Sequence, residues 1–278
     1  MTPEVCLPPG EFVPPDISAF RAGNRGIDYV VTIDSGRSGP HVLLNALTHG
    51  NETCGAVALI ALHEMNIQPR QGRLTMVFAN VAAFEAFDPA DPYANRFVDE
   101  DFNRIWRNDY LDSPSISAEV ARARQLRPIY AEADALLDLH SMSNDASPLL
   151  LCGRTRRGRL LARRLGYPAW AVADDGHRAG PRLIDYDAFA DFDSARTAVL
   201  VECGQHWRAE SADVALKVCL RMLDAYGMLD RAAMAPSRPA PRAQMRPTPM
   251  AHLRRAPMAP SRREKRQRRG GDRLDRFA

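Results

Sequence analysis

Residues 41–52 read HVLLNALTHGNE. Residues 42–47 form an apolar run with the length and content of a buried strand. A polar turn with a glycine follows, and apolar residues then recur over 56–62 at the spacing of one helix face. His49 and Glu52 therefore lie where a central strand gives way to a helix. In open α/β sheets this rim is where ligands bind.

His49 and Glu52 are three residues apart, so one turn can direct both side chains at a single point. An imidazole nitrogen and a carboxylate oxygen are suitable ligands for Zn²⁺. The simpler interpretation is that Glu52 opens the helix, where the helix dipole favours an acidic side chain, and that His49 is only a turn residue. The H-x-x-E pattern is weak by itself, so the rest of the chain has to decide.

Strands and helices are expected to alternate along the chain. The expected strands are 26–34, 41–47, 73–79, 135–139, 149–152, 168–173 and 197–201, and the expected helices are 52–66, 116–133, 154–166 and 209–229. This order predicts an α/β fold with a mostly parallel sheet covered by helices on both sides. Residues 80–115 are expected to be long and irregular, and a loop of that length in a compact domain is usually functional.

Composition limits the class of protein. The 278 residues can bury a sizeable core, and no apolar run approaches the roughly 20 residues that a membrane span needs. The first residues lack a basic segment followed by an apolar one, as a secretory signal would have. The five cysteines are scattered and form no C-x-x-C, which is typical of buried free thiols in a reducing compartment. We expect a cytoplasmic protein that does not bind membranes, and its oligomeric state stays open.

Charge divides the chain into two parts. The whole chain has a net charge of +3, but residues 231–278 alone carry 14 of the 37 basic and 3 of the 34 acidic residues. We predict a folded domain at 1–230 and a disordered Pro/Arg-rich tail at 231–278. The tail could be a basic arm for nucleic acid or another anionic surface, or only a solvated extension. It lacks interleaved aromatic residues for base stacking, which argues against nucleic acid as a partner.

Three further polar motifs end or interrupt apolar segments. His140 follows the apolar residues ALLDL, and its simpler interpretation is a satisfied histidine at the sheet rim. Glu202 follows TAVLV, where an isolated carboxylate would be costly unless it is paired or functional. Residues 95–104 read NRFVDEDFNR and supply two arginines and an amide. Their simpler interpretation is a solvated, salt-bridged loop.

Together the motifs meet the needs of one reaction. A catalytic zinc takes three protein ligands, and the chain offers His49, Glu52 and His140. Glu202 is suited to accept the proton of the attacking water, and Arg96 to stabilise the oxyanion of a tetrahedral intermediate. Asn103 and Arg104 together can hold a substrate carboxylate.

HGNE, NRFVDEDFNR, DLH and VECG, in this order and at these separations, resemble the succinylglutamate desuccinylase/aspartoacylase family of zinc carboxypeptidase-like hydrolases. The resemblance covers about residues 26–230. It implies a mixed, mostly parallel sheet sandwiched by helices, one zinc per chain, and the roles given above to the metal ligands, arginines, amide and general base. A further family arginine, which grips the substrate's second carboxylate, falls on Arg182 or on Arg178. Their spacing decides for neither, and we take Arg182 as the candidate.

The chain departs from the family in three places. Phe102 stands where leucine is usual, and Ser141-Met142 follows His140 in place of a threonine-containing run. The family's small β-rich C-terminal domain is replaced by residues 231–278. Because the chain has only two lysines among its 37 basic residues, as expected from a GC-rich gene, the tail could be a frame-shifted remnant of that domain.

The expected function is zinc-dependent hydrolysis. The bond is an amide, or less readily an ester, in a small carboxylated molecule such as an N-acyl amino acid. Within the same chemistry, the alternative is a metallocarboxypeptidase acting on peptide C-termini. The alternative from another class is a basic-tailed nucleic-acid-binding protein with a vestigial enzyme body. The complete set of metal ligands and the general base argue against that last alternative.

Overall fold

The computed structural model describes residues 13–88 and 90–229. Within these residues, the strands are β1 (Val30–Asp34), β2 (His41–Ala46), β3 (Arg73–Phe78), β4 (Ala135–Met142), β5 (Leu149–Leu151), β6 (Trp170–Val172) and β7 (Thr197–Gln205). The α-helices are α1 (Cys54–Glu64), α2 (Val81–Glu85), α3 (Asn108–Leu111), α4 (Ala118–Ala131), α5 (Arg156–Leu165) and α6 (Ala209–Ala225). Short 3₁₀ helices are η1 (Ser18–Phe20), η2 (Ala94–Arg96), η3 (Phe102–Arg104), η4 (Leu183–Asp185) and η5 (Asp187–Phe189).

The strands of these two ranges form a single sheet in the order β1-β3-β2-β4-β7-β5-β6. The central pairs β3/β2, β2/β4 and β4/β7 are parallel, as is β5/β6, whereas β1/β3 and β5/β7 are antiparallel. The mixed, mostly parallel α/β sheet predicted from the sequence is therefore confirmed. The predicted tail at 231–278 lies outside the described residues.

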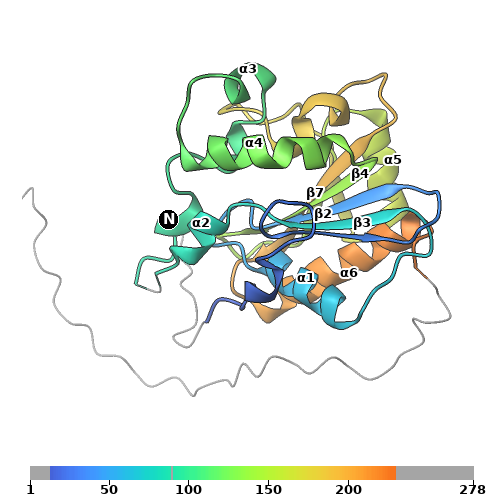
Figure 1. Cartoon of the computed structure of the whole chain (residues 1–278), viewed down its shortest axis with the longest axis horizontal. Helices are drawn as coiled ribbons and strands as arrows, with labels where there is room; N and C mark the ends of the chain where they lie inside the picture. Colours follow the sequence, from blue (N-terminus) through green and yellow to red (C-terminus); the bar gives the residue numbers. More distant parts are fainter. Residues whose placement is uncertain (1–12, 89, 230–278) are drawn as a thin grey trace, which may run out of the picture. The chain divides into compact units, whose positions relative to one another are not determined.

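Helices cover both faces of the sheet (Figure 1). On one face α1, α5 and α6 pack against alternate strand residues such as Val42 and Leu44 of β2. On the other face α3 and α4 pack with the opposite set, which includes Leu43. Every residue of β2 is buried, because a central strand covered on both faces exposes neither side to water. No helix of the described residues is long and apolar enough to cross a membrane.

Two expectations about elements were wrong in part. Residues 80–115 are not wholly irregular, because they contain the short helices α2, η2, η3 and α3. Helices of three to five residues are too short to show a 3.6-residue apolar period. β4 and β7 also run past the apolar segments that predicted them, so His140 and Glu202 lie within the strands and pair across β4/β7. The backbone hydrogen bonds between β4 and β7 continue through His140 and Glu202, because strand pairing does not require apolar side chains.

Candidate metal and catalytic site

The HGNE turn (residues 49–52) leaves the sheet at the carboxyl end of β2. Leu47 has a φ of +57°, a left-handed conformation that is costly for a leucine and turns the chain out of the strand. A Cβ at Gly50 would lie 2.4 Å from the carbonyl oxygen of Asn95, so only glycine fits there. The Gly50 N–H donates to the carbonyl oxygen of Arg96 at 3.1 Å. The turn is therefore packed directly against the arginine loop (residues 95–104).

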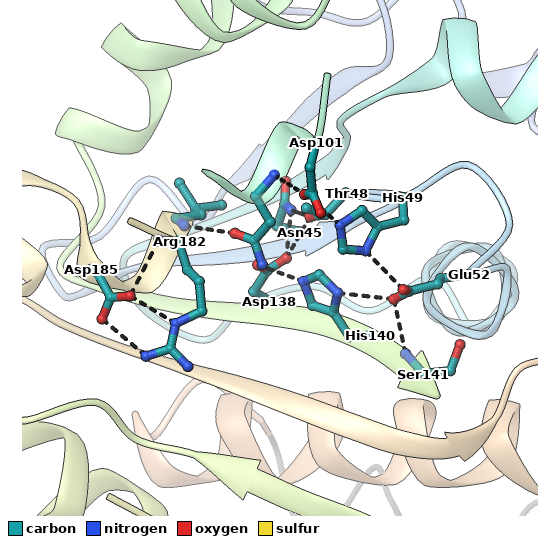
Figure 2. Close-up of polar contacts among 12 residues, drawn as sticks. Asn45, Thr48, His49, Glu52, Asp101, Asp138, His140, Ser141, Arg182 and Asp185 are labelled. Atoms are coloured by element: carbon teal, nitrogen blue, oxygen red, sulfur yellow. Dashed lines mark hydrogen bonds and ion pairs between the residues drawn. The ribbon is translucent and has the colours of Figure 1, made fainter. Parts of the chain in front are cut away.

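Three predicted metal ligands converge at this turn. Possible ligand atoms of His49, Glu52 and His140 all lie within 4.8 Å of one another, and the three residues are buried. His49 Nδ1 lies 2.8 Å from Glu52 Oε1, and His140 Nδ1 lies 2.9 Å from Glu52 Oε2 (Figure 2). Glu52 precedes α1 and His140 lies in β4, so the parallel pairing of β2 with β4 brings the set together.

The Nε2 atom of each imidazole lies within hydrogen-bond distance of a carboxylate. His49 Nε2 is 2.9 Å from Asp101 Oδ1, and His140 Nε2 is 2.8 Å from Asp138 Oδ2. With Nε2–H donated to these carboxylates, each Nδ1 presents its lone pair to the point that the histidines share with Glu52. Carboxylate partners of this kind orient metal-binding histidines and raise their basicity. The donor set and its surroundings therefore fit a zinc ion.

The electrostatics of the cluster also favour a cation. Burial raises the pKa of Glu52, but the charges of His49 and His140 lower it more, leaving it well below its usual value. Burial lowers the pKa of His140, but Asp138 and Glu52 raise it well above its usual value. Burial raises the pKa of Asp101, but the hydrogen bond and charge of His49, together with the charges of Arg96 and Arg104, lower it more. Three carboxylates thus surround two imidazoles, an arrangement that stabilises positive charge.

Arg96 of the arginine loop stands beside this cluster. Its Nη1 is 3.1 Å from Glu52 Oε1 and its Nη2 is 3.3 Å from Asp101 Oδ2. The Arg96 side chain is about one-third exposed, so it can also meet a ligand entering from solvent.

Asn103 and Arg104 lie at the C-terminal end of the arginine loop. Asn103 Oδ1 accepts a hydrogen bond from the Leu183 N–H at 2.8 Å. Arg104 Nη1 donates to the Asn103 carbonyl oxygen, and no carboxylate of residues 13–88 and 90–229 lies within 4.0 Å of its guanidinium. Burial lowers the pKa of Arg104, and the charges of Arg96 and Arg182 add to this, whereas the charges of Asp101 and Asp185 oppose it. Arg104 therefore has charge to offer an incoming anion.

Arg182 is tied to other residues. Its Nε donates to Asp185 Oδ2 at 2.7 Å (Figure 2). Its Nη1 and Nη2 donate to Asp174 at 3.1 and 2.5 Å. Burial lowers the pKa of Arg182, but Asp185 and Asp174 raise it by more, so it lies above its usual value. Arg178, its competitor in the sequence, is exposed. The substrate-binding role predicted for Arg182 stays a prediction, and it would require the guanidinium to exchange or share these partners.

Glu202 faces the cluster from β7. It is paired with His140 in the strand register, and its Oε2 is buried with no hydrogen-bond partner among the described residues. Burial, and then the negative charge of Glu52, raise the pKa of Glu202 to about 7. A carboxylate with a free oxygen and a pKa near neutrality has the properties of a general base.

Sequence reasoning missed several residues around the site. Asp138 had a usable signal, since it lies two residues before His140 and so on the same face of β4. Asp101 had none, because it is 52 residues from the histidine that it contacts. His206 was also missed, and its Nδ1 lies 2.9 Å from Ser141 Oγ, next to the ligand set.

The family model of the succinylglutamate desuccinylase/aspartoacylase catalytic domain matches residues 38–226. A protein named probable aspartoacylase from Prochlorococcus marinus (strain MIT 9313) is 32% identical over 163 residues, which are 51% of this chain and 49% of that protein. The chain thus spans about half the length of this curated relative.

Two solved structures illustrate the likeness in fold. A succinylglutamate desuccinylase from Silicibacter sp. TM1040 superposes with a TM-score of 0.54 at 22% identity, over 72% of this chain and 60% of that one. The ectoine utilization protein EutE from Ruegeria pomeroyi superposes with a TM-score of 0.55 at 22% identity, over 72% of this chain and 61% of that one. At these identities the likeness shows a shared fold. With the family match over most of its length, the chain belongs to the succinylglutamate desuccinylase/aspartoacylase family.

Proposed function

We propose that this protein is a zinc-dependent hydrolase that removes the acyl group from a small carboxylated substrate such as an N-acyl amino acid. The observation that carries the proposal is the convergence of His49, Glu52 and His140 on one point, with Arg96 and Glu202 beside it. Membership of the desuccinylase/aspartoacylase family supports the same reaction class.

The three ligands would hold one zinc per chain and leave a position open for the reactants. When bound, zinc supplies Lewis-acid chemistry, because it lowers the pKa of water and polarises a carbonyl oxygen. Asp101 and Asp138 would keep the two imidazoles in the tautomer that ligation requires.

Glu202 would move the protons. Its Oε2, which has no other partner among the described residues, accepts a proton as the water oxygen attacks the acyl carbon. The same carboxyl group then gives that proton to the amine nitrogen as the C–N bond breaks. The products are a carboxylic acid, which releases its proton to solvent at neutral pH, and an amine, and Glu202 returns to its ionised form.

The arginine loop would bind and orient the substrate. Arg96 donates to the acyl oxygen as negative charge develops on it, which lowers the barrier by stabilising the tetrahedral intermediate. Arg104, with no carboxylate partner among the described residues, holds the substrate carboxylate. Asn103 can add its side-chain N–H₂ group, because its carbonyl oxygen is already occupied by the Leu183 N–H.

Metal analysis with a substrate panel tests the proposal. Purified protein should contain about one zinc per chain and release amine from at least one N-acyl amino acid. Peptides with free C-termini serve as the matched panel. Hydrolysis of peptides alone would identify a metallocarboxypeptidase. A zinc-loaded protein that cleaves neither panel would refute the proposed deacylation.

We also propose that the protein works in the cytoplasm. Cys54, Cys152, Cys203 and Cys219 are buried free thiols, as is usual in a reducing compartment. Fractionation of the source cells with compartment markers would test this location, and recovery outside the cytoplasmic fraction would contradict it.

A further inference from the structure

Glu119 is a fully buried carboxylate that does not belong to the predicted metal-ligand set. It lies in the first turn of α4 and is 0% exposed. Its Oε1 accepts hydrogen bonds from Asn80 Nδ2 at 2.9 Å and from the Val98 N–H at 2.7 Å. Its Oε2 accepts from the N–H groups of Asp99 at 3.0 Å and Glu100 at 3.3 Å. Among the described residues its hydrogen-bond partners are these four donors, so both of its oxygens act as acceptors.

The three backbone donors lie in the middle of the arginine loop. Successive N–H groups directed at one anion form a nest, which holds the loop in a single conformation. Residues 98–100 lie between Arg96, which contacts Glu52, and Asp101, which contacts His49. Glu119 therefore binds the stretch of loop that lies between these two side chains.

Glu119 is also connected to the HGNE turn. Asn80, which donates to Glu119, donates through its backbone N–H to the Leu47 carbonyl oxygen at 2.8 Å. Leu47 leads directly into the turn that carries His49. One carboxylate thus joins the end of β2, the end of β3 and the arginine loop.

We propose that Glu119 is a positioning residue that holds Arg96 and Asp101 in register with the metal ligands. The proposal rests on the function proposed above, because Arg96 is the group through which Glu119 acts on the reaction. Glu119 touches neither the predicted ligands nor the reacting atoms. Other contacts tie the loop to α4, including the Ala118 N–H to Asp99 Oδ2 at 2.8 Å. The backbone N–H groups of residues 98–100, however, all donate to the two carboxylate oxygens of Glu119.

Glu119→Gln is the first test. The substitution keeps the shape but replaces one acceptor oxygen with an N–H₂ group, which then faces two N–H donors in either orientation. The loop should shift, and kcat should fall about 10²-fold, the usual cost of misplacing a catalytic group by about 1 Å. At saturating zinc the zinc content should stay at the wild-type level, because the three ligands lie outside the loop, but the Kd for zinc should rise about 10-fold as Asp101 shifts from His49. Glu119→Asp, which keeps the charge, is the second variant if the first does not fold, and the same losses are expected.

A double-mutant cycle with Arg96→Ala separates positioning from general support. If Glu119 acts through Arg96, Glu119→Gln should lower kcat far less in the Arg96→Ala background than in the wild type. Equal losses in both backgrounds would overturn the proposal. Glu132→Gln is the matched control at the other end of α4, where it loses ion pairs with Arg25 and Arg73. It should lower Tm while kcat per zinc-loaded molecule stays unchanged.

Amide hydrogen exchange provides a readout independent of activity. The N–H groups of residues 98–100 should be protected in the wild type and exchange faster in Glu119→Gln, while those of β2 stay protected. Unchanged exchange at residues 98–100 would overturn the positioning role even if activity fell. If the wild type cleaves no acylated substrate but the exchange result holds, the proposed reaction fails and the anchoring of the loop stands.

Discussion

Glu202 combines features that are costly for stability and useful for catalysis. Its Oε2 is buried and has no hydrogen-bond partner among the described residues. Such a group is normally removed by selection unless it has a function, because burying an unsatisfied carboxylate destabilises the fold. A structural ion pair with Arg182 would be the alternative explanation, but Arg182 is paired with Asp174 and Asp185. Proton transfer therefore stays the role that we propose for Glu202.

Glu202→Gln should fold, retain zinc and bind substrate, yet lose about 10²–10⁴-fold in kcat, the usual contribution of general acid–base catalysis. The amide keeps the shape of the side chain and removes its basic oxygen. Zinc content, Tm and kcat measured on this variant check the expectation. Near-normal kcat with zinc in place would end the assignment of Glu202 as the base.

Arg96 and Arg104 differ in what they contact, so their loss should differ too. Arg96→Ala should lower kcat by roughly 10²–10³, because it removes a donor to the developing oxyanion. Arg104→Ala should mainly raise KM, because a carboxylate anchor acts in the ground state as well. Steady-state kinetics of both variants on one substrate make the comparison. The same kinetic pattern in both would contradict this division of roles.

At the scale of elements, most of the predicted site residues lie in loops and very short helices. The arginine loop and the segment from Asp174 to Asp185 are held by side-chain contacts rather than by long helices or strands. In the last of these, Arg182 bonds two aspartates that are eleven residues apart and so closes the segment. Such contacts depend on charge, which makes the segment sensitive to pH.

Asp174→Asn tests this sensitivity. Burial raises the pKa of Asp174, but hydrogen bonds from Arg182 and Gly176 lower it more, so the folded-state pKa lies below the usual 3.8. A carboxyl group with a lowered pKa stabilises the fold above its unfolded-state pKa and loses that contribution as pH falls through the folded-state value. The Tm difference between wild type and variant should stay constant from about pH 7 to about pH 5 and shrink below about pH 4. A difference that grows as the pH falls would contradict the assignment.

At the scale of the whole molecule, metal binding and folding should be coupled. The ligands come from the turn after β2 and from β4, so a bound ion joins segments that are 88 residues apart in sequence. A ligand that binds only the folded state stabilises it by about 4 kcal/mol at 1,000 times its Kd.

Chelation should therefore lower Tm, and added zinc should restore it. Differential scanning calorimetry with and without a chelator measures the shift, and His140→Ala should show little response to either reagent. Full zinc occupancy in His140→Ala would remove that residue from the ligand set.

Much of the architecture could be predicted because it is periodic. The apolar run of β2 and the helical spacing after it are local patterns, and their alternation along the chain indicates a parallel sheet whose strand ends share one rim. The family resemblance, confirmed by the match over residues 38–226, also rests on local motifs. The domain boundary predicted at residue 230, and the roles of the individual site residues, stay predictions.

What the sequence by itself determined is the fold class, the order of the elements and the convergence of HGNE, DLH and VECG at the sheet rim. Only the tertiary structure decided that Asp101 supports His49, that Arg182 is closed by two aspartates, and that Glu119 anchors the arginine loop. The physical reason is that periodicity reports which side of an element is buried, through the hydrophobic effect. Hydrogen bonds between short segments carry no period, and they depend on distances that exist only after the chain has folded.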